Sequence, residues 1–556
     1  MTADTRVRDL IRWFGDPADP ANPVGRAALL AADEQGEPSA AGEWLLDEYG
    51  FGAEFVPVEL GGRFTQLDDL VRVAREVFRR DVGLGLGYGI TSFMASVNVW
   101  AAGTPQQRKQ LAGLLLDGGK VSVGYHELAH GNDFLRNEFT ADRTPGGYRL
   151  NGTKEVVNNA DRAGAWVLFA RTDPAPGARS HSVLLTGPED CADGAVTFLP
   201  RYPTTGVRGC RLTGLDFRDC EIPAGALVGT EGQGAELALR SFQVTRSALP
   251  GMAVGTLDTC LRTVLGFALG RRLYRRRVLD LPHAASVLTG AFADLLLCDS
   301  LALAAARAVH LLPGQSSVTG AAVKYLVPKL LTRTANDLSV ILGARFYVRE
   351  GEHSLFGKHL RDLPVLSLGH AGPTACLATL IPQLPRLARN PGPPAPDALF
   401  TPGGPLTPGI PYDHLTVTAD GDALTGVLEE SSAPNDPYVQ TLLGQLSREL
   451  NVVRKALLAL PPAERTPLAG PASFRLADRY VHFMAAAAAL GVWRAAADDF
   501  LADPAWLATA LHRTATRLSL RPAPPPAEHT ARLHAELLRR HDENRSFDLY
   551  DLCLNG

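Results

Sequence analysis

The chain has 556 residues, of which 46% are hydrophobic and 21% charged, so it can form sizeable cores and two to four domains are expected. It carries 55 Lys and Arg against 59 Asp and Glu, and the net charge of -4 argues against a nucleic-acid-binding protein and an acidic tail. We find no signal peptide and no apolar run long enough to span a bilayer, so we expect a cytoplasmic protein with no membrane contact.

The apolar residues of the first part of the chain recur at helical spacing, which predicts an N-terminal helical domain over 1–120. The clearest runs are AGEWLLDEYGF and LDDLVRVAREVFRRD. Short β-rich runs such as WVLFART and HSVLLTG, separated by Gly, Pro, Asp and Asn, then predict a middle β domain over 121–233. Long, nearly all-round apolar helical patterns over 234–388 predict a helical bundle domain.

The segment 389–411 is rich in Pro and Gly, which predicts a linker. Helical periodicity returns after it and predicts a C-terminal helical extension over 412–556. The expected fold class is therefore mainly α with a central β domain. The seven cysteines lack CxxC or Cys/His spacing, so we expect reduced thiols and neither a disulfide framework nor a metal site: Cys191, Cys210, Cys220, Cys260, Cys298, Cys376 and Cys553.

Two motifs of the β domain, GYHELAHGND (124–133) and YRLNGTKEVVNNADRAGAWVLFARTD (148–173), resemble the acyl-CoA dehydrogenase family at the loops that hold its flavin. Further matches in the family's order are LLDEYGFGAEFVPVELGG, LTGLDFRDCEIPAGALVGTEGQG, VTRSALPGMAVG, GRRLYRRRVLD and ILGARFY followed by LRDLPVL. The resemblance covers residues 24 to 388. It implies an N-terminal helical domain, a β-barrel-like middle domain, a four-helix-bundle third domain and noncovalently bound FAD.

The resemblance also assigns cofactor-binding residues in the β domain. Tyr125 and His126 take the places from which the family reaches the pyrimidine side of the flavin, and Asn132 takes that of a serine that contacts the pyrophosphate. Asn158, with Val157 beside it, stands where the family commonly has a threonine or serine near flavin N5 and O4. Two departures are HELAHGND for the usual TEPGAGSD, and Val156 for the tryptophan that often flanks the ring.

In the third domain the resemblance implies a contact between subunits. Arg271 of GRRLYRRR would hold the pyrophosphate of FAD in a neighbouring subunit, with Tyr274 packed near the flavin. Gly343 and Ala344 of ILGAR are assigned to the same cofactor. We therefore expect at least a dimer, either a homodimer or a homotetramer.

The place of the catalytic base differs from the family's usual pattern. The family's glutamate stands eight residues beyond the aspartate of an RD pair, which here leads from Asp362 to His370, or else on the helix with the TR pair, which leads to Thr245. Neither position holds a carboxylate. A neutral imidazole is a competent general base near neutral pH, so we expect His370 to remove the α-proton, with Arg246 positioning the thioester.

Several alternatives stay open around this base. His370 could instead be structural or bind substrate, and a loop slipped by one residue would put Ala371 at the base position. We assign Thr245 and Gly369 to substrate binding. Glu350, Glu352 and His353, in an apparent insertion, are the next candidates for the base.

Three functions remain possible for such a chain. The first is an FAD-dependent dehydrogenase of acyl or aminoacyl thioesters, held on CoA or on an acyl or peptidyl carrier protein. The second is a flavoprotein of the same fold that performs non-oxidative α-carbanion chemistry or oxygenation, and the third is a non-catalytic paralogue or scaffold. The unusual base and a composition heavy in Ala, Arg, Leu and Pro favour secondary metabolism.

Overall fold

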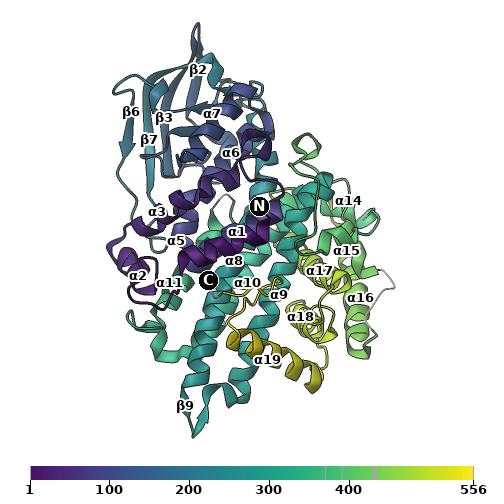
Figure 1. Cartoon of the computed structure of the whole chain (residues 1–556). Coiled ribbons are helices and arrows are strands. Elements are labelled where there is room, and N and C mark those ends of the chain that lie inside the picture. Colours follow the sequence, from purple (N-terminus) through teal and green to yellow (C-terminus); the bar gives the residue numbers. More distant parts are fainter. Residues whose placement is uncertain (1, 370, 391, 430–434, 555–556) are drawn as a thin grey trace. The chain divides into compact units, whose positions relative to one another are not determined.

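The computed structural model describes residues 2–369, 371–390, 392–429 and 435–554 (Figure 1). The chain divides into two compact units, which are described one at a time. The first comprises Met1–Ala18, Gln66–Arg80 and Arg246–Gly556, and the second comprises Asp19–Thr65 and Asp81–Thr245. This division differs from the five segments expected from the sequence, because some of the N-terminal helices belong to the first unit and others to the second.

The second unit contains an eight-stranded sheet with the strand order β6-β7-β3-β2-β4-β5-β8, and β1 pairs in parallel with β4. The two longest strands, β3 and β7, pair antiparallel, and the register shifts between Lys154 and Val157. The strands are β1 (Val121–Gly124), β2 (Thr140–Thr144), β3 (Gly147–Asn158), β4 (Ala165–Arg171), β5 (His181–Thr186), β6 (Val196–Leu199), β7 (Leu212–Pro223) and β8 (Leu227–Val228).

Aromatic and aliphatic side chains fill the core of this sheet, among them Phe139, Tyr148, Trp166 and Phe217. Helix α6 (Thr91–Ala102) packs against β1, where the backbone N–H of Val121 donates to Ser92 Oγ at 3.1 Å. This contact holds the start of the loop that follows β1. The other helices of the unit are α2 (Arg26–Gln35), α3 (Ala40–Tyr49), α5 (Val82–Leu84), the π-helix η3 (Gly85–Ile90) and α7 (Pro105–Leu116).

The first unit is helical, and its two long helices α9 (Pro282–Leu311) and α10 (Ser316–Leu342) pack against each other (Figure 1). Both are buried over most of their lengths, as expected for helices whose apolar residues are not confined to one stripe. Helix α8 (Gly234–Gly270) crosses the unit boundary at Thr245 and Arg246. The remaining elements up to residue 389 are α1 (Ala3–Phe14), α4 (Leu67–Arg80), β9 (Arg272–Leu273), β10 (Arg276–Arg277), α11 (Ser354–Asp362), α12 (Val365–Leu368), α13 (Pro373–Leu380) and α14 (Leu384–Arg389).

The C-terminal helices belong to the same unit as the bundle, and α17 (Pro471–Ala495), α18 (Pro504–Arg517) and α19 (Ala527–Asp542) pack on α9. The segment expected to be a linker also packs, because Phe400 is fully buried and its ring would lie 2.5 Å from a Cβ atom at Gly491. Only glycine therefore lets this segment approach the neighbouring helix so closely. The C-terminal helices are α15 (Ala423–Gly426), α16 (Pro437–Ala459), α17 (Pro471–Ala495), α18 (Pro504–Arg517) and α19 (Ala527–Asp542).

The last described residues of the chain are anchored in the bundle by buried polar contacts. Asp548 is fully buried and forms ion pairs with Arg75 at 3.1 Å and with Arg79 at 3.0 Å, both on α4. The backbone N–H groups of its neighbours donate to Asp258 on α8 and Asp299 on α9, at 2.6 and 3.0 Å. The end of the extension is thus part of the bundle core.

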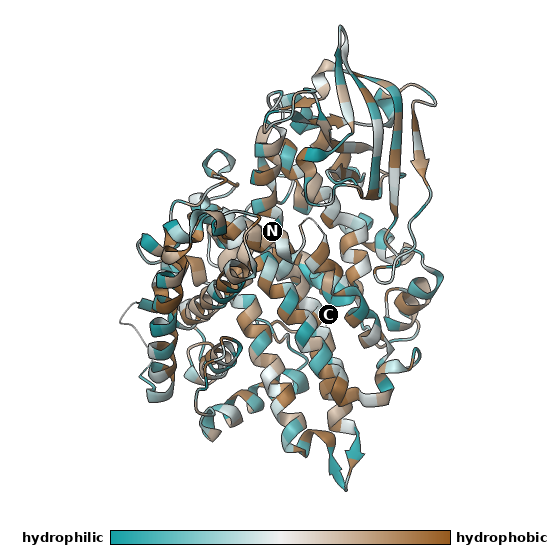
Figure 2. Ribbon diagram, turned by 180° about the vertical axis from the view of Figure 1, so that it is seen from behind, coloured by the Kyte–Doolittle hydropathy of each residue, from teal (hydrophilic) through white to brown (hydrophobic). Residues whose placement is uncertain are grey.

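Four described helical stretches are long and apolar enough, by length and composition, to cross a membrane, so the expectation that no such run exists was wrong. They are Val82–Ala102, Gly234–Gly270, Pro282–Leu311 and Ser354–Leu380. The apolar windows of the first and third are 94% buried inside the folded chain. Figure 2 shows hydrophobic and hydrophilic residues mixed along the long bundle helices.

Candidate functional site

Tyr125, directly after β1, is a core residue of the second unit. Its hydroxyl donates to Asn98 Oδ1, which also accepts from Ser241 Oγ at 2.8 Å. Its ring meets those of Phe169 and Phe242 edge-on, with centroids 5.9 and 5.2 Å apart, and burial raises the pKa of the phenol. The side chain therefore braces the loop after β1, and only the backbone there is left to meet a ligand.

His126 fixes the turn that follows. Its Nδ1 lies 3.1 Å from the carbonyl oxygen of Gly131, which can only accept, so Nδ1 carries a proton in this arrangement. The ring stacks on Phe242 at 6.5 Å and 17°. Gly131 has a φ of +54°, a conformation that favours glycine, and the next residue, Asn132, is exposed. The loop thus presents Asn132 on its surface.

A buried ion pair ties this loop to β3. Lys154 Nζ and Glu127 Oε1 are 2.9 Å apart, and Glu127 also accepts from the backbone N–H groups of Glu138 and Phe139 at 2.7 and 3.1 Å. Burial lowers the pKa of Lys154 to about 8, against the attraction of Glu127. With every oxygen of Glu127 engaged, the pair is structural and holds both flavin-loop motifs together.

The β3 bulge sets the next candidate residues. Val156 has a φ of +53° and is 38% exposed, although a β-branched residue in this region costs about 1–3 kcal/mol, while Val157 lies in the sheet core. Asn158 Nδ2 donates to Leu86 O at 3.0 Å and to Thr91 Oγ1 at 2.9 Å. Its Oδ1 is buried with no hydrogen-bond partner among the described residues, so Asn158 offers an acceptor here, whereas a threonine hydroxyl can both donate and accept.

In the first unit, Arg271, Gly343 and Ala344 line one pocket of about 540 Å³. Gly343 ends α10 with a φ of +57°, and a Cβ atom there would meet no atom within 4 Å, so backbone conformation rather than space favours glycine. Tyr274 does not line the pocket and is 88% exposed at the tip of the β9–β10 hairpin. This arginine-rich hairpin is hydrophilic in Figure 2.

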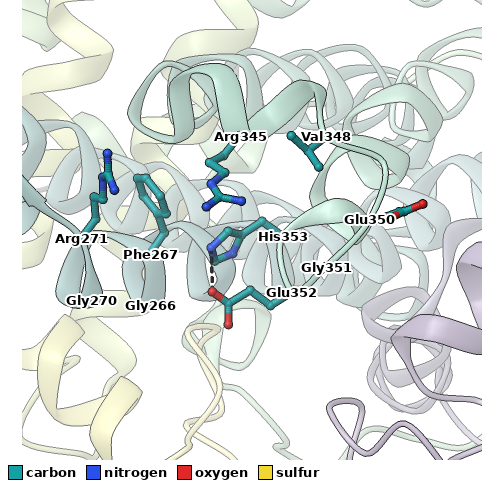
Figure 3. Close-up of a pocket in the computed structure, with 10 residues that line it drawn as sticks. All are labelled: Gly266, Phe267, Gly270, Arg271, Arg345, Val348, Glu350, Gly351, Glu352 and His353. Carbon is teal, nitrogen blue, oxygen red and sulfur yellow. Dashed lines mark ion pairs between the residues drawn. The ribbon is translucent and has the colours of Figure 1, made fainter.

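A second pocket of about 320 Å³ adjoins the first and shares Phe267, Arg271, Arg345 and Val348 with it (Figure 3). The three alternative bases also line this pocket: Glu350, Glu352 and His353. His353 Nε2 lies 2.9 Å from Glu352, and its ring meets Phe267 edge-on at 5.3 Å. This pocket thus brings Arg271 together with the three residues of the insertion. Phe267 and Arg345 also line it, and the sequence analysis did not identify them.

The turn expected to carry the base follows two short helices. Asp362, at the end of α11, is fully buried and forms an ion pair with Lys358 at 2.8 Å. Gly369 is exposed and ends α12, and His370 itself lies outside the described residues. Ala371 is buried and has a φ of +95°, a conformation that glycine adopts readily and alanine does not.

Two buried cations lie close to Cys376, in the helix α13 that follows this turn. Arg246 is 8% exposed and Lys324, which the sequence analysis missed, is 2% exposed on α10. Burial lowers the pKa of both, that of Lys324 to about 8, and both act electrostatically on the thiol of Cys376. Within the described part of the chain, Lys324 has no carboxylate as an ion-pair partner. A single lysine in the apolar run AAVKYLV was the signal for it.

Thr245, the remaining candidate from the sequence, adds little to this site. Thr245 is buried, and its Oγ1 donates to the Phe242 carbonyl within α8 at 3.4 Å. Its hydroxyl is thus engaged by its own helix. Among the described residues, no group of three or more His, Cys, Asp or Glu side chains is placed to hold a metal ion.

Known families match the chain over this region. Residues 122–220 match the family described as "Acyl-CoA dehydrogenase, middle domain", and residues 232–383 match "Acyl-CoA dehydrogenase, C-terminal domain". Potato 2-methylacyl-CoA dehydrogenase is 24% identical over 241 residues, which are 42% of this chain and 56% of that protein. The match thus spans a little over half of that relative's length.

Solved structures with the same fold have TM-scores near 0.6. Butyryl-CoA dehydrogenase from Megasphaera elsdenii has a TM-score of 0.60 at 18% identity and is covered over 96% of its length by 67% of this chain. PigA with FAD and proline has 0.59 at 19%, covered over 95% by 67% of this chain. The prolyl acyl carrier protein oxidase AnaB has 0.56 at 18%, covered over 96% by 67%.

The order of helices, sheet and bundle, and the two matched regions, define the class. Residues 122–220 and 232–383 are similar to the two acyl-CoA dehydrogenase domains, in agreement with the family resemblance found in the sequence. The fold class predicted from the sequence, mainly helical with a central sheet domain and extra C-terminal helices, is confirmed.

Proposed function

We propose that the chain binds FAD and removes the α-proton of an acyl group held as a thioester, with hydride transfer to the flavin. The single observation that carries the proposal is the pocket in which Arg271, Gly343 and Ala344 meet. An arginine beside a glycine turn suits a pyrophosphate, because the guanidinium can form two charge-assisted hydrogen bonds and the bare backbone allows close approach. PigA, a structural neighbour, has been solved with FAD.

The loops of the second unit offer further groups that suit FAD. Asn132 is exposed for a phosphate contact, and the buried Oδ1 of Asn158, which lacks a hydrogen-bond partner among the described residues, can accept from an N–H group of a ligand. When bound, FAD supplies an acceptor for the β-hydrogen as hydride. The residues of this chain supply orientation and hydrogen bonds.

The left-handed conformation of Ala371 supports the proposal that His370 is the base. The family's base motif has a glycine after the base, and Ala371 adopts a glycine-like φ of +95° at that place. This agrees with the unslipped count from Asp362. A neutral His370 would accept the α-proton, and the buried charges of Arg246 and Lys324 would favour the negative oxygen that develops on the thioester.

The pocket that holds Glu350, Glu352 and His353 gives these residues another role. They lie with Arg271, the residue proposed for the pyrophosphate. A group beside the pyrophosphate is remote from the reacting flavin ring. We therefore propose that Glu350, Glu352 and His353 contact FAD near its pyrophosphate, and that His370 removes the α-proton.

Exposed apolar side chains beside the Arg271 pocket support an oligomer. Val340, Tyr347 and Val348 are 70%, 82% and 44% exposed, and Leu273 and Tyr274 of the hairpin are 40% and 88% exposed. Such a cluster is typical of a protein contact surface. We propose that a second copy of the chain covers it and offers its FAD to Arg271, in a homodimer or homotetramer.

The acyl group is proposed to be held on a carrier protein, in secondary metabolism, or on CoA. The neighbour AnaB is a prolyl acyl carrier protein oxidase, which also favours a second candidate in which oxygen is the final acceptor. The buried charges of Arg246 and Lys324 would suit non-oxidative carbanion chemistry equally well, since both reactions begin with loss of the α-proton.

Visible spectra of the purified protein test the proposal. Flavin absorbance that remains after desalting, and that bleaches on anaerobic addition of an acyl thioester, is the expected result. Bleaching reversed by air with oxygen uptake would identify the second candidate's oxidase form, and α-proton exchange without bleaching would identify carbanion chemistry. Protein refolded with excess FAD that retains none of it would refute the flavin proposal itself.

A further inference from the structure

Two cysteines of the second unit belong to the core of the sheet. Cys220 is in β7 and is fully buried in the sheet core, and the half-buried Cys191 packs against the same core. The two thiols interact, because each is the largest single influence on the pKa of the other. The two cysteines are 29 positions apart in the sequence. The fold of the chain therefore brings them together.

Backbone contacts fix this juxtaposition. β6 and β7 pair antiparallel from Val196 opposite Phe217, and the N–H of Arg218 continues the ladder by donating to Ala195 O at 2.9 Å. The segment before β6 therefore runs back along the part of β7 that contains Cys220. Asp190 accepts from Thr186 Oγ1 at 3.1 Å and from the Gly187 N–H at 2.9 Å, which holds the turn directly before Cys191.

We propose that Cys191 and Cys220 form a reversible redox site that reacts with a peroxide to give a disulfide in the folded protein. The pair combines one thiol that solvent reaches with a second, buried thiol in the same sheet core, which is the arrangement that resolves a sulfenic acid before further oxidation. The site is separate from the proposed flavin chemistry and does not depend on it.

The reaction balances with hydrogen peroxide as the only co-reactant. The thiolate of Cys191 attacks one peroxide oxygen, the O–O bond breaks, and the leaving hydroxide takes a proton to become water. Cys220 then attacks the sulfur of the sulfenic acid, the S–S bond forms and the S–O bond breaks with loss of a second water. The two thiols lose two electrons and the peroxide gains two.

The thiol–thiol contact also affects reactivity. It lowers the pKa of buried Cys220 and raises that of Cys191, so the thiolate of Cys191, the thiol that solvent reaches, forms in only a small fraction of molecules. The carboxylate of Asp190 raises the pKa of both thiols, so the reaction is slow at neutral pH and faster in mild alkali. A thiol pair that reacts slowly at neutral pH would respond to prolonged exposure to peroxide.

Peptide mapping after peroxide treatment tests the proposal in a Cys553→Ser background, which removes the exposed cysteine. The folded protein is treated with hydrogen peroxide, blocked with an alkylating reagent and digested. The expected result is a Cys191–Cys220 linked peptide, loss of two thiols per chain, and reversal by a dithiol. The linked protein should unfold at a temperature about 5 °C higher, because the link closes a long loop.

Two single variants in this background serve as controls, Cys191→Ser and Cys220→Ser. Each should abolish the linked peptide, and Cys191→Ser should slow thiol loss about tenfold or more because Cys220 is buried. The proposal is overturned if the link forms only after denaturation. It is equally overturned if Cys191 accumulates as the sulfinic acid while Cys220 stays open to alkylation upon unfolding.

Discussion

Lys324 Nζ donates a hydrogen bond to the backbone carbonyl oxygen of Leu366, so a buried cation of α10 holds the short helix α12. The last residues of α12 lead directly to Gly369 and the proposed base. A lysine satisfies an orphan carbonyl at a helix end and adds a favourable charge there. Lys324 therefore positions the turn on which the proposed chemistry depends.

Replacement of Lys324 by methionine should remove a pH dependence of stability. Burial lowers the pKa of Lys324 from 10.5 to about 8, so between these pH values the unfolded chain binds a proton that the folded chain lacks. The stability of the wild type relative to Lys324→Met should rise between pH 8 and 10.5 by up to about 3 kcal/mol. Urea unfolding at both pH values measures the difference, and Lys455→Met, at an exposed lysine, is the matched control.

Replacement of Ala371 by glycine should stabilise the protein. Ala371 has a φ of +95°, and glycine adopts that conformation without the steric cost of a Cβ atom. We expect a gain of about 1 kcal/mol in urea unfolding. The matched control is Ala375→Gly within α13, which should lose about 1 kcal/mol because glycine is a poor helix residue. Destabilisation by both changes would contradict the strained conformation at Ala371.

Replacement of Asp548 by alanine should destabilise the first unit by about 3–5 kcal/mol, because it leaves the buried charges of Arg75 and Arg79 less compensated. Burial raises the pKa of Asp548, but the two arginines overcome this and hold it below the ordinary value. The carboxylate's contribution is thus present above about pH 4 and lost as the pH falls further. Denaturant unfolding at pH 7 and pH 3 measures both effects.

Asp542→Ala is the matched control for Asp548. Its side chain is 72% exposed at the end of α19, where a substitution should change stability by less than about 0.5 kcal/mol. Equal small effects of both substitutions would show that the chain end is not part of the bundle core.

The sequence predicted where the sheet domain begins, but it did not predict the buried contacts that hold the irregular segments in place. The β-rich runs predicted a sheet domain from residue 121, where β1 begins, because alternation and turn residues are local signals. The burial of Phe400 in a Pro/Gly-rich segment had no such signal, since it depends on the absence of a side chain at Gly491. The contacts of Asp548 with α4 likewise join residues 469 or more positions apart.

The candidate site shows the same limit. The resemblance named Arg271, Gly343 and Ala344, and the fold brings these three into one pocket. It also named Tyr125, whose hydroxyl proves to be engaged by Asn98, 27 positions earlier. Family patterns predict which positions along the chain belong to the site. The hydrogen-bond partners of each side chain depend on the packing of this particular protein, which the family pattern does not contain.

Replacement of Arg271 by alanine should weaken FAD binding about 10–100-fold, because a charge-assisted contact with the pyrophosphate is lost. Arg276→Ala is the matched control, since it removes an exposed arginine of the same hairpin that does not line the pocket. Quenching of flavin fluorescence gives both dissociation constants. Equal losses in the two variants would mean that the hairpin acts only through its total charge.

Replacement of His370 by alanine should abolish exchange of the substrate's α-proton in deuterated buffer and leave the flavin spectrum intact. The base must be neutral to accept a proton, so wild-type exchange should rise with pH through the histidine pKa. Cations near the base would move that rise to lower pH, because they disfavour the imidazolium form. Lys324→Met should then shift the rise upward by removing one of them.

His370→Glu separates the base from a structural histidine. A carboxylate in the same place can accept the proton, so some exchange should return with its onset at lower pH, in keeping with the lower ordinary pKa of glutamate. A structural histidine would give no such rescue, because glutamate does not reproduce its shape or hydrogen bonds. Wild-type exchange in His370→Ala would remove His370 from the reaction. The same measurement on Glu350→Gln, Glu352→Gln and His353→Ala would then decide among the residues of the second pocket.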